Sequence, residues 1–131
     1  MILTVLAYPK DFPQGVPPQN AQAADGIAYR VVVNNPPKQQ DFCGYYREPF
    51  QKKVPANPPP NFFGTSMYRK YESIKLARDL YKNLRGKKIA KGKLSSEYGV
   101  ISDERHDSHF EAWLKENCGI EKNFEVLSCE L

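Results

Sequence analysis

Proline is the residue that most constrains this chain, because several of its eleven copies are gathered into short runs that divide the sequence. The runs are Pro17-Pro18, Pro36-Pro37 and Pro58-Pro59-Pro60. Proline has no backbone N–H, and it disfavours helical geometry in the residue before it. We therefore expect no long helix to pass through residues 38–61, where further single prolines follow one another closely.

Segments beside these runs have patterns typical of β-strands. Residues 27–33 are rich in β-branched side chains and stand between Gly26 and a turn at 34–37, which indicates a strand with a clear end. Its apolar run 31–33 predicts cover on both faces. Lysines alternate along residues 87–94, so we expect an edge strand there. The other predicted strands are 2–8, 62–68 and 124–129.

Two segments have patterns typical of amphipathic helices. Between Tyr71 and Leu84 the apolar residues fall on one side of a helical wheel. This predicted buried face consists of Ile74, Ala77, Leu80, Tyr81 and Leu84. The second pattern starts at Ser108, where Ser108 and Glu111 match a capping box. Its predicted buried residues are Phe110, Trp113 and Leu114, and it ends at Cys118 and Gly119.

These elements predict an α+β fold with one small mixed sheet of about five strands, two amphipathic helices and proline-rich loops. At 131 residues the chain has the usual size of one domain, so we expect a single α+β domain over 1–131. Its 40% hydrophobic content is enough for a folded core.

Composition also limits the cellular context and the chemistry. No run approaches the ~20 apolar residues of a membrane span, and the first residues make a poor signal peptide, so we expect no membrane and a cytoplasmic location. Cys43, Cys118 and Cys129 are odd in number and lack Cys-x-x-Cys spacing, which disfavours disulfides and a zinc site. His106 and His109 lie among acidic residues, which would suit a metal ion. We interpret Asp107, Ser108 and His109 instead as the start of a helix, so no metal site is predicted.

One arrangement joins several segments. Tyr29 and Arg30 lie inside the strongest predicted strand, and Gly64-Thr65-Ser66 lies inside a later strand that leads into a helix. This order resembles the core of small ADP-ribosyltransferase-like domains. The resemblance implies that Arg30 holds the phosphates of NAD, which would be the cofactor, and that Ser66 with Thr65 orders the pocket of the nicotinamide ribose. A bidentate guanidinium suits a pyrophosphate.

The resemblance also implies a late glutamate that acts on the ribose, where a carboxylate suits a developing oxocarbenium ion. Glu125, on the last predicted strand, is the candidate catalytic residue, and Glu97 is the second choice. The chain departs from the transferase pattern, since it has no Glu-x-Glu pair near its end and no Ser-Thr-Ser sequence.

Residues 29–113 are also similar to a group of small uncharacterised bacterial proteins. The shared features are the Tyr-Arg strand, an Asp-Phe turn at Asp41, the Gly-x-Ser strand with its helix, and a His-Phe-x-x-Trp segment from His109 to Trp113. This resemblance implies a shared fold and brings no activity with it.

Three functions remain open at this stage. We favour a small protein that binds a protein partner, such as an inhibitor, an immunity protein or a phage or mobile-element antagonist, because irregular loops can present a binding face without chemistry. The NAD-dependent transferase is the alternative. A weak nucleic-acid binder is the third, with aromatic residues such as Tyr68 for stacking. Its cations would be Arg85, Lys87, Lys88, Lys91 and Lys93.

Overall fold

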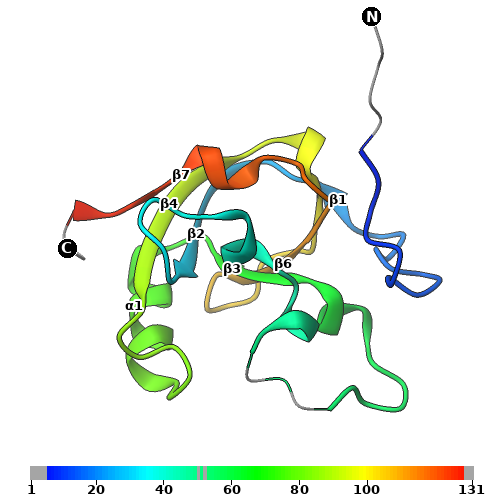
Figure 1. The fold of residues 1–131 in the computed structure, drawn as a ribbon, viewed down its shortest axis with the longest axis horizontal. Helices are drawn as coiled ribbons and strands as arrows, with labels where there is room; N and C mark the ends of the chain where they lie inside the picture. Colours follow the sequence, from blue (N-terminus) through cyan, green and yellow to red (C-terminus); the bar gives the residue numbers. More distant parts are fainter. Residues whose placement is uncertain (1–5, 50, 52, 129–131) are drawn as a thin grey trace, which may run out of the picture.

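One curled antiparallel sheet of seven strands dominates the computed structural model, which describes residues 6–49, 51 and 53–128 (Figure 1). The strands are β1 (Gln22–Ala23), β2 (Gly26–Val32), β3 (Thr65–Tyr68), β4 (Lys88–Leu94), β5 (Gly99–Ile101), β6 (His109–Leu114) and β7 (Phe124–Val126). Their spatial order is β1-β5-β6-β3-β2-β4-β7. Within the described residues the only α-helix is α1 (Tyr71–Leu80). The expectation of about five strands in a mixed sheet with two helices is therefore wrong.

The second expected helix is strand β6. Its residues 110–113 are all buried, because β6 lies between β5 and β3 with apolar side chains on both faces. Apolar residues on both faces satisfied the helical spacing as well as the strand spacing. Ser108 is not a helix cap either: its φ of 66° is left-handed, and its hydroxyl accepts a hydrogen bond from the backbone N–H of Lys70. The capping-box interpretation therefore described the wrong element.

The sheet buries a different cluster on each face. One face carries the main core, where Ala28 and Val32 of β2 pack with Met67, Ala90 and Phe110 from neighbouring strands. The other face carries α1, whose Ile74 packs with Val31 and Ile89. Alternate residues of a strand point to opposite faces, so β2 is covered on both sides, as its sequence predicted.

Helix α1 is shorter than its apolar pattern predicted. Ile74 and Ala77 are buried as expected, but 63% of Leu80 and 57% of Tyr81 is exposed. Six residues turn a helix by about 600°, which places Leu80 about 120° around the axis from Ile74 and off the buried face. Tyr81 follows the end of the helix. Leu84, beyond the helix, is half-buried and packs against the same cluster as Ile74. The predicted buried face is therefore correct for Ile74 and Ala77 and in part for Leu84, and wrong for Leu80 and Tyr81.

Two further expectations change at the ends of the sheet. Strand β4 forms where residues 87–94 predicted it, but it pairs with β2 on one side and β7 on the other, so it is not an edge strand. The expected first strand lies partly outside the described residues, and residues 6–8 are not in a strand. Cys129 also lies outside the described residues.

The two sides of β2 are paired to very different extents. On one side, all seven residues of β2 have partners in β4, from Gly26 opposite Leu94 to Val32 opposite Lys88. On the other side, β2 meets β3 at a single pair, Tyr29 opposite Tyr68. Beyond that pair the two strands separate. We call this gap between residues 30–32 of β2 and residues 65–67 of β3 the split.

Candidate functional site

The split is bridged by one irregular segment, residues 39–48, which contains the 3-10 turns η1 (Gln39–Phe42) and η2 (Tyr45–Arg47). The hydroxyl of Thr65 donates to the carbonyl of Phe42, and the N–H of Tyr45 donates to the carbonyl of Gly64 at 2.8 Å. These bonds replace part of the ladder that β2 and β3 do not form. The segment therefore holds the split open.

Asp41 fixes this segment against the end of β2. Its buried carboxylate accepts hydrogen bonds from the N–H of Val33, the side chain of Asn34 and the N–H of Lys38, at 2.8 to 3.0 Å. Burial by itself raises the pKa of Asp41, but these hydrogen bonds outweigh it and lower the pKa below the ordinary value of 3.8. The carboxylate therefore stays ionised.

Arg30 fills the split from the β2 side. Its guanidinium donates to the carbonyl of Asp41 at 3.0 Å and to the carbonyl of Ser66 at 2.9 Å. A third donor lies 2.6 Å from the carboxylate of Glu48, and the two side chains are 9% and 15% exposed. Among the described residues these three contacts use three of the five donors, so Arg30 can still bind an anion while it holds the segment.

A cavity of about 280 Å³ opens over the split on the face that carries α1. Polar groups from three segments meet there: Arg30 from β2, Glu48 from the bridging segment, and Ser66 from β3. Aromatic rings surround these groups and give the cavity flat apolar walls. The full lining is Arg30, Val31, Tyr45, Glu48, Ser66, Tyr68, Ile74, Tyr81, Asn83, Leu84, Asp107 and His109.

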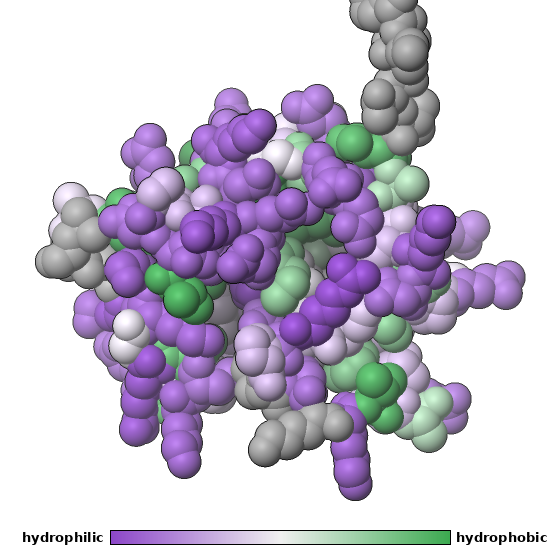
Figure 2. Space-filling view, in the orientation of Figure 1, coloured by the Kyte–Doolittle hydropathy of each residue, from purple (hydrophilic) through white to green (hydrophobic). Residues whose placement is uncertain are grey.

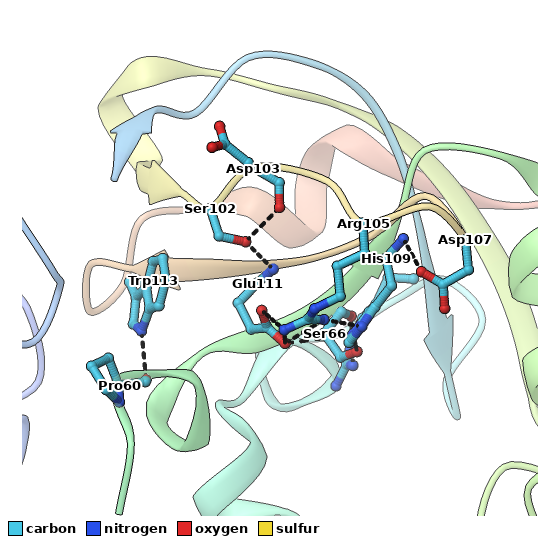
Figure 3. Close-up of polar contacts among 10 residues, drawn as sticks. Pro60, Ser66, Ser102, Asp103, Arg105, Asp107, His109, Glu111 and Trp113 are labelled. Carbon is cyan, nitrogen blue, oxygen red and sulfur yellow. Dashed lines mark hydrogen bonds and ion pairs between the residues drawn. The ribbon is translucent and has the colours of Figure 1, made fainter. Parts of the chain in front are cut away.

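The side chains of Ser66 and His109 meet diagonally across the β3–β6 pair, as Figure 3 shows. The hydroxyl of Ser66 contacts Nε2 of His109, and the guanidinium of Arg105 contacts Nδ1 of the same ring. An arginine can only donate, so Nδ1 must accept and the proton of the neutral ring lies on Nε2. The imidazole then donates to Ser66, whose own O–H is available to a ligand in the cavity.

This arrangement does not suit Ser66 as a nucleophile activated by histidine. A histidine that takes the proton of a serine needs Nε2 unprotonated, and it needs a carboxylate to stabilise the ring cation through Nδ1. Here a cation occupies that place. Burial lowers the pKa of His109 below its ordinary value of 6.5, and Arg105 lowers it further, against the opposing effect of Glu111. Ser66 is therefore a hydrogen-bonding group of the cavity.

Glu111 lies behind His109, one side chain away from the cavity. It sits on β6 directly opposite Ser66, and its carboxylate accepts two-pronged hydrogen bonds from Arg105 at 2.9 and 3.2 Å (Figure 3). Its nearest oxygen is 3.6 Å from Nε2 of His109. Glu111 thus holds Arg105 and the ring of His109 in place.

Tyr68 completes the wall next to His109. The two rings pack together with centroids 4.9 Å apart and planes tilted by 31°. Burial raises the pKa of Tyr68 to about 12, with a smaller effect from Asp107, so the phenol keeps its proton at neutral pH. The residue offers a flat face and a neutral hydroxyl.

A second cavity, of about 400 Å³, lies beside the Arg30–Glu48 pair. Both cavities have Arg30, Val31, Glu48 and Leu84 in their linings, so they are neighbours at this pair. Lys87 and Arg47 add two further cations to the second cavity. Arg47 is already paired with the carboxylates of Asp11 and Glu116.

Positive charge is concentrated in one stretch of the chain that borders these cavities. Residues 69–93 hold ten basic and two acidic residues, whereas the rest of the chain holds nine basic and thirteen acidic residues. The stretch covers α1, the turn after it and most of β4. The modest overall charge of +4 therefore hides a strong division between two parts of the molecule.

The sequence-predicted residues reach different places. Arg30, Ser66 and Tyr68 line the first cavity, but Thr65 points to the opposite face, where its hydroxyl bonds to Phe42. Glu125 is exposed on β7, opposite Lys91, with β4 and β2 between it and β3, and it does not line the cavity. Glu97 is exposed in the 3-10 turn η4 (Ser96–Tyr98), also away from the cavity.

The basic residues predicted for nucleic acid do not form one continuous site. Lys88 donates to the carbonyl of Val33, Lys91 lies over the ring of Tyr29, and Arg85 bonds to the backbone of Asp79. Lys93 lines a different hollow near Asn123. Of the five, only Lys87 lines either of the two cavities at the split.

Sequence reasoning missed Glu48, His109 and Arg105 as members of the site. Glu48 follows a Tyr-Tyr-Arg turn in a segment without periodicity, so nothing in the sequence connects it with Arg30. His109 was assigned to a helix start, and that assignment hid its position opposite Tyr68. Assigning residues 109–114 to a strand would have placed His109 and Glu111 on the same face.

Comparison of the chain with protein-family models, with curated proteins and with solved structures found no match in any of the three. In the described part of the chain, no three metal-ligating side chains lie close enough to hold an ion. None of the helices described here is long and apolar enough to cross a membrane.

Proposed function

We propose that this protein binds NAD in the cavity at the split and cleaves the bond between nicotinamide and ribose, passing the ADP-ribose to water or to another acceptor. The observation that carries the proposal is the meeting of Arg30, Glu48 and Ser66, from three separate segments, in one cavity with aromatic walls. Such a combination of flat apolar walls and a few convergent polar groups is typical of small-molecule sites.

The chemistry requires little from the protein beyond charge and position. As the bond from ribose C1′ to the ring nitrogen breaks, its electron pair leaves with nicotinamide, which departs as a neutral molecule. The sugar becomes cationic, and a nearby carboxylate stabilises it. A water molecule or an acceptor group then bonds to C1′ and loses a proton.

Glu48 and Asp107 both line the cavity, whereas Glu111 does not, and we assign the task to Glu48 because it lies 2.6 Å from Arg30. Arg30 would bind the pyrophosphate next to it. The free O–H of Ser66 would hold a sugar or amide oxygen, and the rings of Tyr68 and His109 would pack against the nicotinamide.

The test is release of nicotinamide from millimolar NAD, measured by chromatography for the wild type and for three glutamate variants. We expect Glu48→Gln to lose about a hundredfold in rate, the cost of removing one group that stabilises transition-state charge. Glu111→Gln should lose less, because it acts through His109.

Glu125→Gln is the matched control, since it makes the same chemical change outside the cavity. It should keep the wild-type rate. Equal losses in Glu125→Gln and Glu48→Gln would contradict the proposal, and so would an absence of nicotinamide release by wild-type protein whose thermal unfolding is cooperative.

A protein partner is the second candidate, and one feature of α1 favours it. The outer face of the helix carries Leu76 and Leu80, which are 61% and 63% exposed, close to the exposed ring of Tyr81. On the face seen in Figure 2, hydrophilic side chains cover most of the surface and hydrophobic areas are small. If α1 binds a partner, a Leu76→Lys, Leu80→Lys variant should lose a complex that the wild type forms in lysate.

A further inference from the structure

We propose that the second cavity, lined by Lys87, is a subsite for a nucleoside diphosphate, with the diphosphate held between Lys87 and Arg30. The orientation of a whole dinucleotide across both cavities rests on the proposed function, but binding of a nucleoside diphosphate does not. Two features support the subsite, namely the position of Arg30 in the linings of both cavities and the charge of Lys87, and a third, the carboxylate of Glu48, provides a test because it opposes binding.

Arg30 is common to the two neighbouring cavities, since it belongs to the lining of both. A ligand whose anionic group binds Arg30 therefore has one space on each side of that group. A dinucleotide has this shape, with a pyrophosphate between two nucleosides. The cavity with aromatic walls takes the half that is cleaved, so the second cavity takes the other half.

The charge comes from Lys87. Within the described residues, no carboxylate forms an ion pair with its ammonium group, in contrast to Arg47 at the same cavity. Lys87 is half-buried in the turn after α1. Val33 and Asn34 contribute an apolar surface and an amide to the same cavity, which suits a nucleoside.

Glu48 supplies the competing charge. Its carboxylate lies 2.6 Å from Arg30 and occupies one of the positions from which a phosphate oxygen would bind the guanidinium. A diphosphate must share the guanidinium with this carboxylate, and the two anions repel each other. Removal of the charge from Glu48 should therefore strengthen diphosphate binding, although the proposed function predicts that it slows cleavage about a hundredfold.

The experiment is calorimetric titration with ADP and with inorganic pyrophosphate at low salt, on the wild type and three variants. Lys87→Gln should weaken ADP binding about tenfold, the usual value of one charge-assisted contact. Lys82→Gln removes a positive charge from the same turn without touching either cavity and should leave the affinity unchanged. Glu48→Gln should bind ADP several-fold more tightly, which keeps the test valid if Lys87→Gln unfolds.

Equal affinity of Lys87→Gln and the wild type for ADP would overturn the subsite, as would weaker binding by a folded Glu48→Gln. Equal affinity for ADP and pyrophosphate would also overturn it, because the cavity would then bind a bare anion. The failure of the proposed function looks different: ADP binding would depend on Lys87 while no nicotinamide is released. If the wild type releases nicotinamide but binds ADP no more tightly than Lys87→Gln does, the subsite is overturned and the proposed function is not.

Discussion

The two sides of β2 show that one strand can form a regular ladder on one side and border a cluster of polar side chains on the other. On the β4 side, seven consecutive residue pairs form a regular ladder. On the β3 side, one pair is followed by the split, where side chains form the hydrogen bonds that a backbone ladder would otherwise form. The ladder pairs its backbone groups with one another and leaves them closed to a ligand. The split brings an arginine, a glutamate and a serine to one point.

The split needs more specific residues than the ladder does. A ladder forms from backbone groups that every residue except proline carries. The split depends on Arg30 and Asp41, whose buried charges must all find partners. Substitutions on the two sides of β2 should therefore fail in different ways.

The largest effect is expected for Arg30→Met, which removes the side chain that fills the split. It leaves the carboxylate of Glu48 and the carbonyls of Asp41 and Ser66 without their donor. Loss of one partner of a buried ion pair costs about 3 to 5 kcal/mol, so we expect about 4 kcal/mol from urea unfolding. A double variant with Glu48→Met should recover part of this loss. A decrease of less than about 1 kcal/mol in the free energy of unfolding would contradict the role of Arg30 in stabilising the split.

Gly92→Ala should disturb β4, the strand that forms the regular ladder with β2, at a cost of about 3 kcal/mol. An added Cβ at this position would lie 2.4 Å from the carbonyl oxygen of Asn123 and 2.4 Å from the ring of Phe124, so β4 and β7 would have to separate. Lys93→Ala, at the exposed neighbouring position, is the control and should change the free energy of unfolding by less than about 0.5 kcal/mol. If folded Gly92→Ala lost ADP binding as well, the two sides of β2 would not be independent.

Asp41→Asn should cost about 2 kcal/mol, since an amide cannot accept all three hydrogen bonds of the carboxylate. The same substitution should also change how the stability of the chain depends on pH. The pKa of Asp41 is lower in the folded chain than its ordinary value of 3.8, so its contribution is complete above that value and is lost as the pH falls through the folded pKa. Acid titration of the melting temperature should show a smaller loss in Asp41→Asn than in the wild type.

His109 gives the smallest expected effect. The folded chain lowers its pKa below 6.5, because burial and Arg105 outweigh Glu111 and Asp107. The unfolded chain therefore takes up protons first, and stability should fall as the pH drops below 6.5 towards the folded pKa. His109→Gln should flatten the melting temperature in this range. If the melting temperature of His109→Gln fell as steeply with pH as that of the wild type, a group other than His109 would be responsible for the decline.

The strongest local patterns in the sequence were enough to predict β2, β4 and the first half of α1. In β2 the β-branched run and the turn at Pro36 agree, and in α1 the spacing of Ile74 and Ala77 agrees with the buried face. Each of these elements follows from residues close together in the chain, so a local pattern contains enough information.

The rest depended on contacts between distant segments. Strand β6 is buried on both faces between β3 and β5, and a sequence buried on both faces has no single period to read. Glu48 joins the site only because η1 and η2 cross the split, and that path is set by the hydrogen bonds of Asp41. No local pattern in residues 39–48 predicts these contacts.

The dependence on contacts between distant segments also explains why Glu125, the predicted site residue, does not line the cavity. Glu125 was chosen because it is late in the chain, but strand order decides which residues are neighbours, and β7 lies beyond β4 and β2 from Ser66. Sequence position alone could not distinguish β7 from β6, where Glu111 faces Ser66 across one residue pair.

The uneven distribution of charge has a consequence for the rate at which a ligand arrives. The basic stretch 69–93 borders the cavities, and the more acidic remainder of the chain repels anions from the other surfaces. If the split binds an anionic nucleotide as we propose, this field guides the nucleotide towards the split before any contact forms, and the association rate should fall as added salt screens the field. Short contacts with partly buried groups would hold the complex, so its dissociation rate should depend much less on salt.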